Sequence, residues 1–129
     1  MPEAGEAEGS CLCGAVRFTV SGPPKWTAYC HCTSCRKQTG APVSAYAGFE
    51  RDQVRFIGSE PQTYASSQGV ERSFCGRCGS TVGYRGDRWP SEIHLHVGLF
   101  DDPEPFAPKG HAFADERLGW VHIAEPPLP

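Results

Sequence analysis

Two short stretches, far apart in the chain, carry paired cysteines: Cys11-Leu12-Cys13-Gly14 and Cys75-Gly76-Arg77-Cys78-Gly79. A CxxC followed by a small residue predicts a tight knuckle that aims both sulfurs at one ion. In the CxC stretch, residues i and i+2 of an extended segment project to the same side. Each stretch can therefore supply two thiolates to one tetrahedral zinc, whose structural sites bind four sulfurs at about 2.3 Å.

A third cluster, Cys30-His31-Cys32-Thr33-Ser34-Cys35, lies between the two pairs, so seven cysteines divide into four plus three. Spacing alone leaves two pairings open. The knuckle at residues 75–78 can combine with residues 32–35 as a ribbon-type site, or with residues 11–13. We favour the second pairing because it leaves the middle triple intact as an open site, and because ribbon-type pairs are usually roughly 15–20 residues apart.

Roles for the cysteines that do not involve zinc fit their spacing less well. Buried cysteines that act as small hydrophobic residues would be scattered rather than clustered at ligand spacing. A reversible disulfide between Cys75 and Cys78 is a redox alternative, and iron–sulfur ligation is a further one. The odd cysteine count and the acidic N-terminus MPEAGEAEGS, which does not resemble a signal peptide, argue against a disulfide scaffold. We therefore expect a cytoplasmic zinc protein.

The 129 residues predict one domain with a lean core, since Gly 15 and Pro 12 accompany only 39% hydrophobic residues. A net charge of −3 gives no basic footprint for nucleic acid. No stretch approaches the roughly 20 apolar residues of a membrane helix. We expect a disordered tail over residues 1–9, the zinc-binding domain over residues 10–124, and a proline-rich tail over residues 125–129.

Short alternating runs bounded by Gly, Pro or Ser predict a mainly β fold of short strands, arranged as a sandwich, barrel or tent. The expected strands cover residues 15–20, 26–29, 43–49, 54–57, 62–66, 70–74, 81–84 and 92–97. One or two helical turns are expected at residues 33–38. Metal binding would add directly to the folding free energy of such a chain.

The histidines have modest predicted roles. His31 points away from its neighbouring cysteines on an extended segment, so packing or a hydrogen bond is favoured over a role as fourth ligand. His94 and His96 share one strand face and are expected at the solvent or at the rim of a pocket. His111 is a weak pocket candidate, and His122 is expected at the surface.

Three cations and three tryptophans could serve a substrate. Arg36, Lys37 and Arg72 can attract an anionic thiol such as glutathione, because Arg holds a carboxylate bidentately. For each of them, a solvated surface charge is the favoured interpretation. The three indoles are expected in the core rather than against a substrate: Trp26, Trp89 and Trp120.

The ordered motifs at residues 9–14, 30–36 and 74–80 resemble those of the glutathione-dependent formaldehyde-activating enzyme family, whose domain centromere protein V also carries. The stretch Val97-Gly98-Leu99-Phe100-Asp101-Asp102-Pro103 and the segment from His111-Ala112-Phe113 to Trp120 extend the resemblance. It covers residues 9–123, nearly the whole chain.

The resemblance implies a β-tent of short antiparallel sheets stapled by zinc, similar to methionine sulfoxide reductase B. It implies a structural zinc on Cys11, Cys13, Cys75 and Cys78, and a catalytic zinc on Cys30, Cys32 and Cys35. The implied activity is that of a carbon–sulfur lyase acting on a small thiol such as glutathione, with formaldehyde as the other reactant. The alternative is a non-catalytic zinc-stabilised binding module. The two differ in whether the triple stays open to a substrate.

Overall fold

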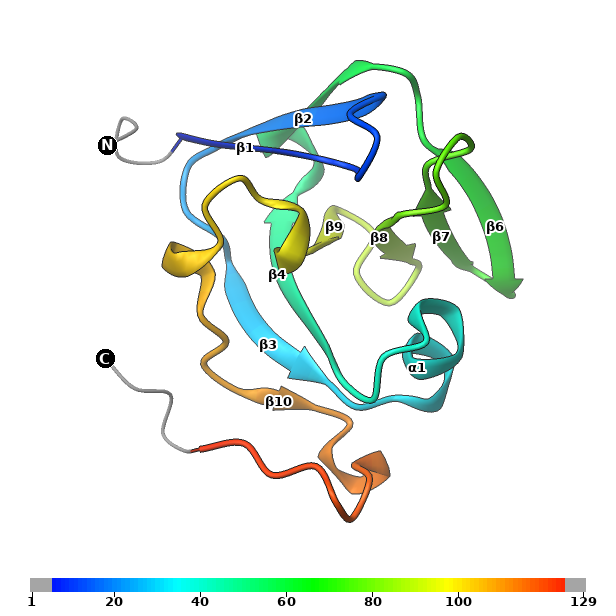
Figure 1. The fold of residues 1–129 in the computed structure, drawn as a ribbon, viewed down its shortest axis with the longest axis vertical. Coiled ribbons are helices and arrows are strands. Elements are labelled where there is room, and N and C mark those ends of the chain that lie inside the picture. The colour runs from blue at the N-terminus through cyan, green and yellow to red at the C-terminus, as the bar shows by residue number, and fades with distance from the viewer. Residues whose placement is uncertain (1–5, 125–129) are drawn as a thin grey trace.

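A computed structural model of the chain describes residues 6–124, which form two mainly antiparallel sheets and one short α-helix (Figure 1). The strands are β1 (Glu6–Ser10), β2 (Val16–Ser21), β3 (Trp26–Cys30), β4 (Ser44–Glu50), β5 (Val54–Gly58), β6 (Gln62–Ser67), β7 (Val70–Phe74), β8 (Thr81–Gly86), β9 (Glu92–His96) and β10 (His111–Ala112). The α-helix is α1 (Thr33–Thr39), and single 3-10 turns are Arg51–Gln53, Val97–Leu99, Glu104–Phe106 and Ala114–Glu116.

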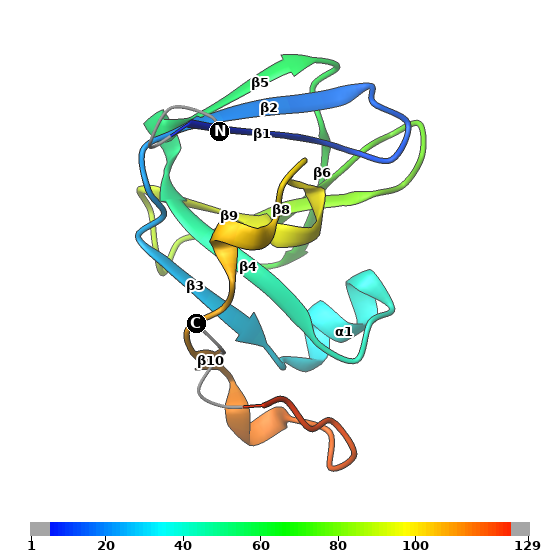
Figure 2. The same cartoon turned by 60° about the vertical axis from the view of Figure 1, so that its left-hand side comes forward.

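The smaller sheet has the order β1-β2-β5 and the larger one the order β10-β3-β4-β9-β8-β7-β6. All neighbours are antiparallel except β10, which runs parallel to β3. In both views the small sheet lies at one end of the molecule and the β10 segment at the other (Figures 1 and 2). The predicted mainly β fold of short antiparallel sheets is confirmed, and so is the short helix.

Sequence alternation explains the strands of the small sheet. In β2 every second side chain is buried: Val16, Phe18 and Val20. Phe18 is only 1% exposed and meets the edges of Phe56 and Phe100 at ring-centroid distances of 6.3 and 5.2 Å. This face packs against the buried residues of β4 and β9, so one core lies between the two sheets.

β1 corrects the expected N-terminal tail, which is wrong for residues 6–9. This segment pairs with β2 from Glu6 opposite Ser21 to Ser10 opposite Arg17. Its Ala, Gly and Glu residues give little strand signal, but the exposed edge of β2 supplies hydrogen-bonding partners. Gly9 is buried, and a Cβ there would meet the Phe18 ring and the carbonyl oxygen of Leu99. The small residue is therefore required by the close approach of two segments.

The remaining boundary predictions lie partly outside the described residues. Residues 1–5 and 125–129 belong to the expected tails and are not described. The expected domain over residues 10–124 stays a prediction, which β1 extends at its N-terminal side. Within residues 6–124, no helix is long and apolar enough to cross a membrane.

Candidate metal centres and the adjoining cavity

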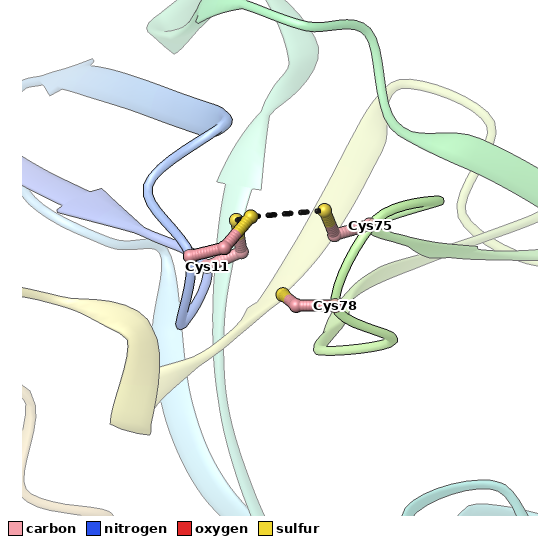
Figure 3. A group of neighbouring side chains, drawn as sticks. Cys11, Cys75 and Cys78 are labelled. Carbon is pink, nitrogen blue, oxygen red and sulfur yellow. Dashed lines mark hydrogen bonds between the residues drawn. The ribbon is translucent and has the colours of Figure 1, made fainter.

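The two cysteine pairs meet in space although 62 positions separate Cys13 from Cys75. The Cys13 sulfur lies 3.7 Å from that of Cys11 and 3.8 Å from that of Cys75. Figure 3 shows the side chains of the two loops converging, with Cys75 and Cys78 from the knuckle between β7 and β8. Four sulfurs at about 2.3 Å from a tetrahedral ion would be separated by about 3.8 Å. The four side chains thus form a group that could hold a metal ion.

Tight turns explain how each pair is presented. Gly14 donates its N–H to the Cys11 carbonyl at 3.1 Å, and Gly79 donates to the Cys75 carbonyl at 2.9 Å. Both glycines have positive φ, at 82° and 81°, which residues with a side chain rarely adopt. The hydroxyl of Ser80 joins the two loops, because it accepts the Leu12 N–H at 3.0 Å.

The same loops shift the charge carried by the sulfurs. The hydroxyl and backbone N–H of Ser80 lower the pKa of the Cys78 thiol to about 5. The N–H of Ala15 lowers the pKa of Cys13, but burial and three neighbouring sulfurs outweigh it and raise that pKa to about 11. Four neighbouring thiolates would repel one another strongly, and a divalent cation bound between them would offset this repulsion.

The middle triple is assembled at the junction of β3 and α1. Cys30 ends β3, Cys32 is the N-cap of α1, and Cys35 lies in the first turn of the helix. The sulfurs of Cys30 and Cys35 are 3.4 Å apart, and the Cys35 N–H donates to the Cys32 sulfur at 3.2 Å. All three sulfurs lie within 4.8 Å of one another, so this group could also hold a metal ion.

Buried polar groups surround the Cys35 sulfur. The Tyr46 hydroxyl and the Arg72 guanidinium each donate to it at 3.5 Å. Hydrogen bonds from Cys30 and Cys32, aided by Tyr46 and Arg72, hold the pKa of Cys35 far below its usual range. The pKa of Cys30 is raised by its sulfur neighbours and by burial. The donors Tyr46 and Arg72 therefore favour the thiolate form of Cys35.

Arg72 corrects the expectation of a solvated charge. It is only 5% exposed, its Nε donates to Ser66 at 3.1 Å, and its guanidinium lies 5.2 Å from the centre of the Tyr84 ring. The anionic sulfur explains why a cation is buried here. Lys37 is exposed as expected, whereas Arg36 is half-buried and donates to Thr33 at 3.3 Å.

A cavity of about 840 Å³ borders the triple. Its lining includes all three cysteines of the triple and the aromatic side chains of Trp26, Tyr46, Tyr84, Trp89, His94, His111 and Phe113. Trp26 and Trp89 therefore line a cavity rather than the core. Trp120, also expected in the core, is 68% exposed because it lies in the C-terminal segment beyond the sheets.

His31 and His111 form a stacked pair beside this cavity. The Nε2 atom of His31 lies 2.8 Å from Nδ1 of His111, and the two rings are 11° from parallel. His31 is 1% exposed, and His111 lines the cavity. The prediction that His31 packs and hydrogen-bonds is confirmed, and His111 is a cavity residue. His122 is exposed, as expected.

His94 and His96 were expected at the solvent or at the rim of a pocket; solvent exposure is wrong for both, whereas His94 does line the cavity. They are 6% and 8% exposed, because all five residues of β9 are buried in the middle of the larger sheet. His94 faces the cavity, whereas His96 packs on the Tyr46 ring with centroids 4.4 Å apart. Burial lowers the pKa of both imidazoles, that of His96 to about 4. The alternation of β9 correctly placed His94 and His96 on the same face of the strand, but it could not show that other side chains bury this face.

The site also contains residues that the sequence pattern did not single out. Glu92 accepts hydrogen bonds from Trp26 Nε1 at 3.2 Å and from His94 Nε2 at 2.9 Å, and it pairs with Lys25 Nζ at 2.8 Å. Tyr46, which donates to Cys35, is a second such residue. Glu92 lies two positions before His94 on a predicted strand, so both side chains project from the same face. This spacing is the sequence feature that could have indicated their contact.

Glu116 ties the C-terminal segment to the helix of the triple. Its Oε1 accepts the Thr33 N–H at 2.9 Å and the Thr33 hydroxyl at 3.0 Å. We expect Glu116→Ala to destabilise the protein by about 1 kcal/mol, the usual effect of losing a helix cap. Thermal unfolding should show a Tm lower by about 4 °C for a chain of this size. Asp115→Ala, which changes an exposed neighbouring acid, is the control; an equal decrease there would contradict the assignment.

Comparison with known proteins identifies the family. The model of the glutathione-dependent formaldehyde-activating enzyme family matches residues 6–116. The chain belongs to this family. A relative from Halomonas elongata that carries the family's name is 35% identical over 127 residues, covering 90% of this chain and 80% of its own. The resemblance noted in the cysteine motifs is thus confirmed.

Two further comparisons agree. A Schizosaccharomyces pombe protein named as an uncharacterised lyase is 32% identical over 99 residues, which cover 74% of this chain and 69% of that protein. A crystal structure of a Rhodobacter sphaeroides protein has a TM-score of 0.66 at 20% identity, covers 81% of this chain and 99% of that one, and shows the shared fold. Membership makes this chain an enzyme of a family named for glutathione and formaldehyde.

Proposed function

We propose that both cysteine clusters bind zinc, and that only one of the two ions takes part in chemistry. Cys11, Cys13, Cys75 and Cys78 would hold a structural zinc, since four sulfurs at tetrahedral spacing leave no position for a substrate. Donor sets made only of thiolates favour zinc among the common divalent ions. The division of seven cysteines into four and three supports this assignment.

The second zinc would be held by Cys30, Cys32 and Cys35 and would be the catalytic ion. The observation that carries this proposal is that all three cysteines line the same cavity of about 840 Å³. A tetrahedral ion with three protein ligands keeps one position open. A bound zinc supplies a lowered pKa for a thiol at that position, so that a thiolate forms at neutral pH.

We propose that the cavity makes and breaks a carbon–sulfur bond between a small thiol and an aldehyde, as a carbon–sulfur lyase does. Glutathione and formaldehyde are the reactants that the family name favours. The thiol sulfur bonds to the aldehyde carbon, the carbonyl π electrons move to oxygen, and the thiol proton ends on that oxygen. The exposed ammonium of Lys109 at the cavity supplies a cation for a carboxylate of glutathione.

Arg72 and Tyr46 assist by holding Cys35 in its charged form. Their hydrogen bonds to the Cys35 sulfur keep this ligand oriented toward its two partners. Neutralising part of the thiolate charge also leaves the ion a stronger Lewis acid than three unassisted thiolates would.

The seven cysteines, all within the described residues, form no disulfide, which fits a reducing compartment, and we place the protein in the cytoplasm.

The proposal predicts that glutathione binds directly to a metal at the triple. Cobalt(II), which reports its thiolate ligands by charge-transfer absorption, is the probe. Adding glutathione to the protein loaded with two cobalt ions should increase this absorption, because the ion at the triple gains a fourth sulfur ligand. Cys32→Ser should bind one ion per chain and show no increase.

Two results would contradict the proposal. One is an unchanged cobalt spectrum at saturating glutathione, as expected for a zinc-stabilised binding module with a closed site. The other is full-affinity binding of two ions by Cys32→Ser, which would mean that the triple is not the second site. S-Methylglutathione, whose sulfur cannot become a thiolate, is the matched control ligand.

A further inference from the structure

We propose that His94 transfers the proton in this cavity and that Glu92 positions its imidazole for that role. The proposal rests on the proposed function, because it names the group that moves the thiol proton during carbon–sulfur bond formation. His94 is the catalytic residue and Glu92 a positioning residue. Neither is a candidate metal ligand among the described residues.

The hydrogen bonds around Glu92 define which nitrogen of His94 is available. Both Glu92 oxygens are engaged: Oε1 accepts from Trp26 and His94, and Oε2 pairs with the Lys25 ammonium at 2.8 Å. Burial raises the pKa of Glu92, but these three donors outweigh it and lower the pKa overall. A carboxylate can only accept, so Nε2 of His94 carries the hydrogen. The lone pair is therefore on Nδ1.

Aromatic rings fix the plane of this imidazole. The Trp26 ring meets it edge-on with centroids 4.5 Å apart, and the Tyr84 ring stacks on it at 5.2 Å. Trp89 closes a further side at 5.2 Å. Trp26 is itself held against β4, where Gly48 leaves room for the indole. A base held in one orientation by packing and by a carboxylate is the arrangement that proton transfer requires.

His94 and the triple line one cavity on either side of Tyr46. The Tyr46 hydroxyl contacts the Cys35 sulfur at 3.5 Å, while its ring centroid lies 6.5 Å from that of His94. A substrate whose sulfur lies near the triple can therefore present its reacting atoms to His94. The charged or titratable groups around His94 are Glu92, Lys25, Tyr46, Tyr84 and Cys35. Burial lowers the pKa of His94 despite Glu92, which leaves the imidazole neutral and able to accept a proton.

The proton and electron movements balance around this one group. The thiol proton passes to Nδ1 of His94 when the thiolate forms, and a sulfur lone pair then forms the bond to the aldehyde carbon. The carbonyl π electrons move to oxygen, which then takes the proton from Nδ1. In the reverse direction His94 removes the hydroxyl proton, the carbon–sulfur bond breaks, and the sulfur receives the proton. No electrons are gained or lost by the protein.

His96 provides a natural control. It lies two positions along the same strand and is equally buried, but it packs behind the Tyr46 ring and does not line the cavity. A merely structural need for a buried imidazole in β9 would apply to both residues. His94 differs in lining the cavity and in its hydrogen bond to Glu92, the two features that proton transfer to a substrate requires.

The test measures the interconversion of glutathione, formaldehyde and S-hydroxymethylglutathione by NMR exchange on protein loaded with two zinc ions. We expect His94→Gly to lower the catalysed rate by about 10²–10⁴-fold. Added imidazole, which fits the space left by the ring, should restore part of the rate. His94→Gln, which keeps a donor for Glu92 but cannot transfer the proton, should be equally slow without rescue. Glu92→Gln should show a smaller loss, and His96→Gln should retain the rate.

Metal content and the cobalt–glutathione absorption should stay at wild-type values in His94→Gln. A wild-type rate in His94→Gln would overturn the inference while leaving the proposed function intact. So would an equal loss in His96→Gln, or a slow His94→Gly that imidazole fails to restore. Absence of a glutathione-dependent cobalt signal in the wild-type protein would overturn the proposed function instead, and this inference with it.

Discussion

Cys75→Ser is expected to release one zinc ion per chain and to leave the protein largely unfolded at temperatures where the wild type is folded. Zinc binding to structural sites contributes about 10–16 kcal/mol in small zinc-binding peptides at neutral pH. A whole domain is stable by only about 5–15 kcal/mol. The four-cysteine group joins the β1–β2 turn to the β7–β8 knuckle, so its loss removes a cross-link between the small sheet and the larger one and leaves only their packing.

Thermal unfolding followed by circular dichroism, together with zinc per chain, measures this effect. Arg77→Ala is the matched control, because Arg77 is exposed in the same knuckle and its backbone N–H to the Cys75 sulfur is retained. The control should change the Tm little. A Cys75→Ser protein that keeps its zinc and its Tm would show that this cluster does not hold the fold together.

Cys35→Ser is expected to abolish catalysis while the fold survives. The triple would lose the sulfur to which Tyr46 and Arg72 donate, and the rate should fall to that of the uncatalysed reaction. The Arg72 guanidinium, buried against this sulfur, would be left without its anion. Removing one partner of such a pair destabilises by about 3–5 kcal/mol, so the Tm should fall measurably.

Zinc per chain should drop from two to one in Cys35→Ser, since the four-cysteine site is untouched. Ser34→Ala is the control: Ser34 is an exposed neighbour on the same helix turn and is not a candidate ligand. Comparing the two separates metal loss from a change in the helix itself. Catalysis that persists in Cys35→Ser at the wild-type rate would place the chemistry elsewhere in the molecule.

Most secondary structure followed from local pattern. β2, β4 and β7 occur where alternation or turn residues predicted them, and α1 begins at Thr33 as expected. β1 was missed because its residues carry no apolar alternation, and its pairing comes from the free edge of β2. A pattern within one segment cannot report the partner that another segment offers.

The candidate site was only half predictable, for a related reason. Cysteine spacing indicated the ligand groups, since chelation depends on neighbours in the chain. Arg72 was expected in solvent, and His94 in solvent or at the rim of a pocket, because charged and imidazole side chains usually lie there. Both are buried, Arg72 beside a thiolate and His94 beside a carboxylate. The partner of Arg72 lies on another element, α1, and that of His94 lies on the same strand, on a face that other parts of the chain bury. The sequence alone shows neither.

The sequence by itself determined the cysteine inventory, its predicted division into groups of four and three candidate ligands, and the family. Local spacing and turn chemistry suffice for these because they depend on residues a few positions apart. The tertiary structure decided between the two pairings, by bringing Cys13 within 3.8 Å of Cys75. It also decided that one cavity unites the triple with His94, because long-range packing sets which side chains face a common space.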